Sequence, residues 1–271
     1  MKSNNKSIFT GTDGPEEPDE TPVTYGLTIP RTSSAIVVFR MLSHVNASMT
    51  YSICATDGHR HGIAIATKAP VVGSLAPNVT REGALSSQAT VNVALGRIGS
   101  RLLAEGSAVD DAVETLLRRD DGAHERQVHG VDRYGRTIHV TGEDCVEWAG
   151  GVEGNGYTVA GNMLEGEHVI AAVAETFEET EGDLPERLLS ALRAGEDAGG
   201  DKRAENAQSA ALQVFGPDPR LEHDVRVDDH EDPVTELRRI YEIARSKGEE
   251  WAGREPPMDL QRYPERGSID W

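Results

Sequence analysis

Residues 49–68 read MTYSICATDGHRHGIAIATK, and this stretch decides the expected fold. Residues 50–55 alternate in polarity and are rich in strand-forming types, and residues 63–67 repeat the pattern after a polar segment, 57–62. Two such runs separated by a short polar segment that contains glycine predict a β-hairpin. We therefore expect ordered structure to begin at Thr50.

The rest of the chain reads as further strands and amphipathic helices. Predicted strands cover residues 83–90, 126–132, 136–141, 156–162 and 207–215. Predicted helices cover residues 93–103, 109–117, 169–177 and 183–195 and a last segment after residue 232. The expected helix-start signals are Ser107 with Asp110, Asp183 with Glu186, and Asp232 followed by Pro233. Helices occur in pairs between groups of strands, which favours an α+β fold with two mostly antiparallel sheets packed together and helices outside.

The two ends of the chain differ from this pattern. Residues 1–21 are mostly Asn, Ser, Gly, Pro, Asp and Glu and lack apolar periodicity, a composition typical of disorder. We therefore divide the chain into a disordered or mis-assigned leader (1–48), a folded domain (49–247) and a polar C-terminal arm (248–271).

The charge balance excludes some partners. The net charge is −19, from 46 acidic and 27 basic residues. Binding to nucleic acid or to anionic lipid needs clustered Lys and Arg, so neither partner is expected. Lysine is scarce, at positions 2, 6, 68, 202 and 247. Many carboxylates with few lysines suggest adaptation to a salt-rich, halophilic cytoplasm, where screening reduces self-repulsion; the alternative is an ordinary acidic enzyme.

The cysteines and the apolar runs indicate a cytoplasmic protein. Cys54 and Cys145 are too few for a disulfide framework, and two free thiols are expected rather than a single bridge. The apolar run at residues 35–39 is too short to span a membrane, and it begins too late for a secretion signal.

Several short motifs together resemble the bacterial and archaeal family called domain of unknown function 1028. They occur in the order MTYSI (49–53), GIAIATK (62–68), GS (73–74), SQA (87–89), RQ (126–127), GEDC (142–145), GNGY (154–157), GN (161–162), AGGDKR (198–203), QSAAL (208–212) and RVDDH (226–230). The likeness extends from about residue 49 to about residue 245, and the ordered set is more specific than any single motif. The family is placed in the N-terminal-nucleophile (Ntn) hydrolase superfamily, which implies a four-layer αββα sandwich, amide-bond chemistry and a homodimer.

The resemblance makes Thr50 the candidate nucleophile. In the superfamily, a Thr, Ser or Cys at the mature N-terminus attacks, and its own α-amine, with a pKa of about 7.7–8.0, acts as the base. Thr50 starts the first strand and follows Met49, which could be an initiator methionine. In the chain as written, however, its nitrogen is an amide. Either Met49 is the true start, or residues 1–49 are a propeptide, or Thr50 is merely the first residue of a strand.

Other residues fit supporting roles in this chemistry. Lys68, at the end of the second strand, could keep the Thr50 amine deprotonated, or it is a solvated strand-end lysine. Gln88 and Asn162 could donate to an oxyanion, or they satisfy backbone groups in loops. Asp201 and Arg203, beside two glycines, could bind a substrate amine and carboxylate, or they form a surface ion pair.

We therefore expect an Ntn-type amidohydrolase that cleaves a small amide or peptide-like molecule without metal or other cofactor. The alternative is a non-catalytic ligand-binding or assembly protein that retains the fold. A weaker third hypothesis is metal-dependent hydrolysis through His59, His61 and His230, although their spacing is not typical of metal ligands. Cys145 has no neighbouring base and is expected to be structural.

Overall fold

The hairpin at the start of the domain forms as expected. The computed structural model describes residues 49–201, 206–216 and 221–252, and β1 (Thr50–Thr56) pairs antiparallel with β2 (His61–Thr67). Asp57 closes the turn, because its Oδ1 accepts hydrogen bonds from the backbone N–H groups of His59 (2.9 Å) and Arg60 (2.7 Å). This register places Thr50 opposite Thr67.

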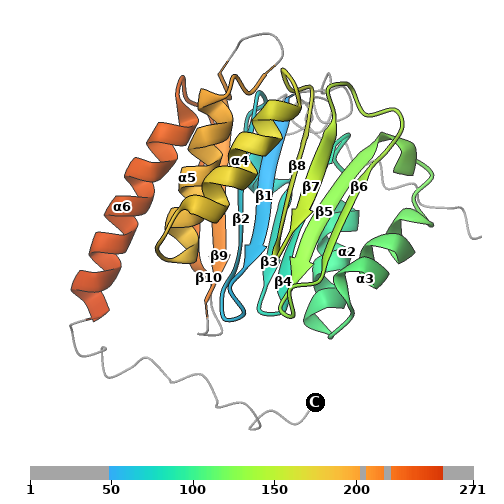
Figure 1. The fold of residues 1–271 in the computed structure, drawn as a ribbon. Coiled ribbons are helices and arrows are strands. Elements are labelled where there is room, and N and C mark those ends of the chain that lie inside the picture. Colours follow the sequence, from blue (N-terminus) through green and yellow to red (C-terminus); the bar gives the residue numbers. More distant parts are fainter. Residues whose placement is uncertain (1–48, 202–205, 217–220, 253–271) are drawn as a thin grey trace, which may run out of the picture. The chain divides into compact units, whose positions relative to one another are not determined.

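The hairpin lies at the centre of the larger of two antiparallel sheets (Figure 1). The six-stranded sheet has the order β10-β9-β2-β1-β8-β7, and the four-stranded sheet has the order β3-β4-β5-β6. The added strands of the larger sheet are β7 (Gly150–Gly154), β8 (Tyr157–Asn162), β9 (Ser209–Phe215) and β10 (Leu221–Val227). Those of the smaller sheet are β3 (Pro77–Thr80), β4 (Gly83–Ala89), β5 (Arg126–Asp132) and β6 (Thr137–Thr141).

Five α-helices in the described residues pack against these sheets. They are α2 (Val93–Ala104), α3 (Val109–Leu117), α4 (Glu167–Glu179), α5 (Leu184–Asp197) and α6 (Pro233–Ala252), and two short 3-10 turns occur at Val72–Ser74 and Ala123–Glu125. Helices α4, α5 and α6 contact the larger sheet, α2 and α3 contact the smaller one, and β1, β2 and β8 contact strands of the smaller sheet (Figure 1). The chain therefore has an α+β fold with two antiparallel sheets.

Alternation along β1 explains how this strand serves two layers. Tyr51 and Ile53 belong to the large apolar cluster shared with the helices, while Ser52 and Cys54 on the other face meet side chains of the smaller sheet. The Tyr51 ring packs so closely on α5 that a Cβ at Gly195 would lie 2.6 Å from its Cε2. The absence of a side chain at Gly195 therefore permits the contact between helix and sheet.

Two predicted helix caps are confirmed and one is wrong. Asp183 Oδ1 accepts from the Glu186 N–H (3.3 Å), and Asp232 Oδ1 accepts from the Thr235 N–H (3.1 Å). Ser107 does not cap α3: Ala108 occupies that position, and no side chain bonds the first turn. Two acidic residues in that turn still interact favourably with the helix N-terminus.

The sequence patterns missed β3, β7 and β10, and α6 continues beyond residue 248, where a polar arm was expected, to Ala252. Residues 1–48 and 253–271, assigned to the leader and to the rest of the arm, lie outside the described residues. Both cysteines are free thiols, Cys54 buried and Cys145 half-buried. None of the helices in the described segments is long and apolar enough to cross a membrane.

Candidate functional site

The start of β1 lies at an end of the sheets where buried polar side chains gather. Thr50 is 6% exposed and faces Thr67 of β2 on one side and Asn162 of β8 on the other. The Thr50 and Thr67 hydroxyl oxygens are 2.9 Å apart, and the Thr67 hydroxyl donates to the Met49 carbonyl at 2.6 Å. Because Thr67 has a single hydroxyl hydrogen, Thr50 is the donor in the bond between the two hydroxyls.

Gln127, at the start of β5, joins the two sheets at this end. Its Oε1 accepts from Gln88 Nε2 (2.8 Å) and from Asn162 Nδ2 (3.1 Å). Its own Nε2 donates toward Thr141 Oγ1 (2.9 Å) and the Gly161 carbonyl (2.8 Å). Gln88, Gln127 and Asn162 are all buried. A buried polar network of this kind is stable only when its members are satisfied, so Gln127 fixes the orientation of both other amides.

The two predicted oxyanion donors, Gln88 and Asn162, differ in whether their amide hydrogens are already used in hydrogen bonds. Gln88 uses both hydrogens of its amide nitrogen, one toward Gln127 and one toward the Ala160 carbonyl at 3.2 Å. A substrate would therefore have to displace one of these bonds before Gln88 could stabilise an oxyanion. Asn162 lies directly opposite Thr50 in the β1–β8 register, which makes it the better placed of the two amides.

A serine and a histidine also meet deeper between the sheets. Ser52 Oγ donates to Gln88 Oε1 (2.6 Å) and lies 2.7 Å from His129 Nε2, and His129 Nδ1 lies 2.9 Å from Thr158 Oγ1. Since the serine hydrogen points at Gln88, His129 donates from Nε2 and accepts at Nδ1. Burial lowers the pKa of His129 to about 3, so the ring is neutral near pH 7. The pair therefore lacks the geometry of a nucleophile activated by a base.

Unusual backbone angles mark the strand ends around Thr50. The three described non-glycine residues with positive φ are Ala89 (65°), Met163 (53°) and Val71 (60°). Ala89 directly follows Gln88, and Met163 directly follows Asn162. Such conformations cost about 1–3 kcal/mol each and cluster at functional sites, where the surrounding structure enforces them. The strain thus coincides with the two amides of the network.

Two of the three remaining predicted site residues, Lys68 and Asp201, lie at the same end. Lys68 directly follows Thr67, the residue opposite Thr50, and its N–H donates to the Met49 carbonyl at 3.0 Å. Asp201 is fully buried and forms a β-bridge with Leu164, two residues after Asn162. Arg203 lies outside the described residues. The structure thus gathers five of the six predicted residues (Thr50, Lys68, Gln88, Asn162, Asp201) at one end of the sheets.

The histidines considered as metal ligands do not gather. His61 starts β2 and bonds Thr56 Oγ1 through Nδ1 (2.8 Å). His230 lies by the other end of β2, because its N–H bonds the Gln208 carbonyl (2.9 Å) and the Gln208 N–H bonds the Thr67 carbonyl (2.7 Å). In the part of the chain that the structure describes, no three His, Cys, Asp or Glu side chains form a group that could hold a metal ion.

The family follows from the sequence comparison. Residues 50–237 match the model of a family of unknown function, DUF1028. The chain belongs to the DUF1028 family. The DUF1028 protein SPO2555 from Silicibacter pomeroyi, whose crystal structure is known, shares 32% sequence identity with this chain. The two structures superpose with a TM-score of 0.70, and the match covers 77% of this chain and 92% of that one. No curated protein matches the chain. The DUF1028 match begins at Thr50, the residue that opens β1.

Sequence patterns did not indicate Thr67, Gln127 or the Ser52–His129 pair as parts of the site of this DUF1028 protein. One signal was available, namely polar residues at every second position of buried strands. Ser86 and Gln88 in β4, and Gln127 and His129 in β5, follow this pattern. A polar face on a buried strand predicts a hydrogen-bonded layer between two sheets.

Proposed function

We propose that the chain is an Ntn-type amidohydrolase with a four-layer αββα arrangement, and that Thr50 with a free α-amine is its nucleophile. The observation that carries the proposal is the position of Thr50. It opens the strand β1 between β2 and β8, with its hydroxyl beside Thr67 and with Asn162 opposite on β8. Helices on the outer faces of two facing sheets support the same superfamily arrangement.

The proposed reaction has two steps. Thr50 Oγ attacks the carbonyl carbon of a small amide while its proton passes to the α-amine, which has a pKa of about 7.7–8.0 when free. The C–N bond then breaks, the leaving nitrogen takes that proton, and an ester joins the acyl group to Thr50. Water hydrolyses the ester, which regenerates the hydroxyl and releases the acid.

Asn162 is the proposed oxyanion donor, and Gln127 is its positioning residue. The bond from Asn162 Nδ2 to Gln127 Oε1 holds the amide opposite Thr50, which removes the need to orient it during the reaction. Gln88, with both amide hydrogens donated, supports Gln127 from the other side. Lys68 would keep the amine deprotonated, and Asp201 and Arg203 would bind substrate. A homodimer in a salt-rich cytoplasm belongs to the same proposal.

A second candidate function is non-catalytic ligand binding or assembly, and one observation favours it. Met49 is completely buried, and its carbonyl accepts bonds from the Lys68 N–H and the Thr67 hydroxyl. While the bond between Met49 and Thr50 is intact, the Thr50 nitrogen is an amide and has no basicity. A mature protein that retains Met49 would therefore lack the general base.

The test compares a protein that starts at Thr50 with one that retains Met49. Both are incubated with an acylating β-lactone probe and with a panel of small amides, and intact mass and peptide mapping locate any adduct. We expect an acyl adduct on Thr50 and amide hydrolysis only in the protein with the free amine. Thr50→Ala abolishes both, whereas Thr56→Ala, at the far end of the same strand, keeps both. Equal labelling with and without Met49 would exclude the mechanism.

A further inference from the structure

A cavity of about 440 Å³ lies beside the end of β2 that meets Thr50. Its lining residues are Lys68, Ala207, Gln208, Asp229, His230 and Glu231. Three of the six, Gln208, Asp229 and His230, belong to two family-like motifs, QSAAL and RVDDH, to which the proposed reaction gives no role. The volume lies within the range of about 300–1,000 Å³ typical of small-molecule sites.

Backbone hydrogen bonds tie the walls of this cavity to the candidate nucleophile. The Gln208 N–H donates to the Thr67 carbonyl at 2.7 Å, and the His230 N–H donates to the Gln208 carbonyl at 2.9 Å. Thr67 is the residue whose hydroxyl contacts the Thr50 hydroxyl. The wall of the cavity is therefore bonded to β2 at the residue that contacts Thr50.

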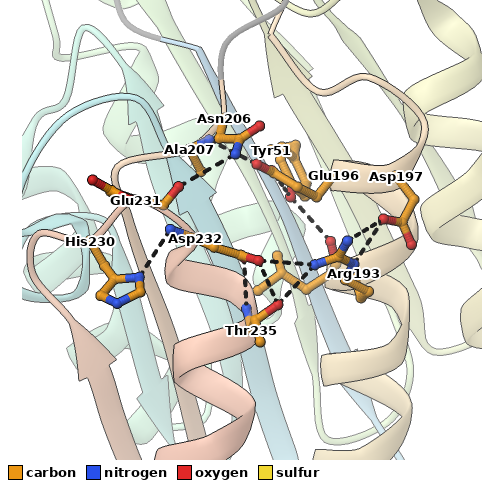
Figure 2. A network of polar contacts seen from close by, with 11 residues as sticks. Tyr51, Arg193, Glu196, Asp197, Asn206, Ala207, His230, Glu231, Asp232 and Thr235 are labelled. Carbon is orange, nitrogen blue, oxygen red and sulfur yellow. Dashed lines mark hydrogen bonds and ion pairs between the residues drawn. The ribbon is translucent and has the colours of Figure 1, made fainter.

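Two lining side chains are already held in place. Asp229 Oδ1 accepts from Gln208 Nε2 at 3.0 Å. His230 Nδ1 accepts from the Asp232 N–H at 2.9 Å, as Figure 2 shows, so a neutral ring carries its hydrogen on Nε2. The carbonyl of the next residue, Glu231, accepts from Asn206 Nδ2 at 3.4 Å (Figure 2). Side chains fixed before a ligand arrives reduce the entropy lost on binding.

The charges on the lining residues select the ligand. Lys68 supplies a cation, Asp229 and Glu231 supply carboxylates, and Ala207 is the single apolar lining residue. An anion without an ammonium group would be repelled by the two carboxylates, and an apolar ligand would remove water from the charged groups without replacing its hydrogen bonds. A small zwitterion satisfies both signs of charge at once.

We propose that this cavity binds the charged groups of the substrate, and that the substrate is a small zwitterionic amide. The ligand's ammonium group contacts Asp229 and Glu231, and its carboxylate contacts Lys68 and the Nε2–H of His230. The inference rests on the proposed function, because it assigns the substrate class of the Thr50 site. It assigns the substrate's ammonium and carboxylate to the cavity, and leaves Asp201 and Arg203 to contact the rest of the substrate.

The experiment measures binding without turnover, by calorimetry on Thr50→Ala protein. The probes are L-alanyl-L-alanine, its N-acetylated form, which lacks the ammonium, and its C-terminal amide, which lacks the carboxylate. We expect the unblocked dipeptide to bind and each blocked form to bind at least about tenfold more weakly. Asp229→Asn should weaken the unblocked dipeptide about tenfold and leave the N-acetylated form unchanged. Lys68→Met should weaken the unblocked dipeptide about tenfold and leave the C-terminal amide, which lacks the carboxylate, unchanged.

The matched control is Asp224→Asn, because Asp224 Oδ1 also accepts from a glutamine, Gln213 Nε2 at 3.2 Å, but is not a lining residue of the cavity. Asp224→Asn should leave binding unchanged. Absence of dipeptide binding, equal binding of the blocked forms, or equal effects of the two Asp→Asn variants would overturn the inference. If Thr50 is acylated while the dipeptide does not bind, the inference fails and the proposed function stands. If the dipeptide binds while Thr50 is never acylated, its role as substrate is excluded and the binding function is favoured.

Discussion

Replacement of Gln127 by methionine removes the amide that joins the two sheets while nearly preserving the side-chain volume. In the folded state, Gln88 Nε2 and Asn162 Nδ2 each lose an acceptor, at 2.8 Å and 3.1 Å, and the Gly161 carbonyl loses a donor. All three amide side chains are buried, so water cannot readily replace the bonds. Each buried group left unsatisfied costs about 1–3 kcal/mol, which for the two donors gives a loss of about 2–6 kcal/mol in the free energy of unfolding.

Urea denaturation at fixed salt concentration measures this loss, with tryptophan fluorescence and circular dichroism as independent probes. Thr141→Val is the matched control, since Gln127 Nε2 donates to Thr141 Oγ1 at 2.9 Å but also reaches the Gly161 carbonyl at 2.8 Å. The other partner of this hydroxyl, His139 Nε2 at 2.8 Å, is only half-buried, so water can replace that bond. One lost acceptor that can be replaced should cost less than about 1 kcal/mol. A loss below about 1 kcal/mol in Gln127→Met, or losses of equal size in the two variants, would refute the network between the sheets.

Three further predictions follow from buried groups and from charge. Burial lowers the pKa of His129 to about 3, whereas in the unfolded state the ring binds a proton near pH 6.5. As the pH falls from about 6.5 to about 3, the free energy of unfolding should therefore decrease by up to about 1.4 kcal/mol per pH unit. Urea titrations of His129→Gln should lack that contribution. Gly195→Ala should destabilise the folded state by about 1–3 kcal/mol, because the added Cβ would lie 2.6 Å from Tyr51. Gly248→Ala in α6 should stabilise it by about 0.5–1 kcal/mol, because the space around Gly248 is open and alanine favours the helix. Thermal melts of both variants distinguish these opposite signs. The net charge of −19 predicts that the melting temperature rises as KCl increases from about 0.1 M to about 1 M; a flat or falling curve would contradict adaptation to salt.

Patterns of neighbouring residues in the sequence predicted the central hairpin, most strands and two helix caps. The β1–β2 hairpin, the strands β4, β5, β6, β8 and β9, and the caps at Asp183 and Asp232 appear where alternation and turn chemistry place them. Strand β7, GGVEG, was missed because it is rich in glycine, and strand β10, LEHDVRV, because its many charged residues resemble a loop although they alternate with apolar ones. Both lie at the edges of the six-stranded sheet, where pairing on one side suffices.

The candidate site was predictable only in part, for a related reason. Thr50, Lys68 and Asn162 could be placed at strand ends from the sequence. Gln127 could not be identified as the residue that joins Gln88 to Asn162, because this depends on which strands of the two sheets face each other. Such contacts between distant segments are fixed by sheet packing and register, which a single sequence does not specify.

The mature N-terminus tests the central claim most directly. The protein is purified from its native host, and its intact mass and N-terminal sequence are determined. A chain that begins at Thr50 has the free α-amine that the proposed mechanism requires, and this is the predicted result. A chain that still carries Met49 or residues before it would have no general base at Thr50, and would contradict the proposed hydrolase in favour of a binding function.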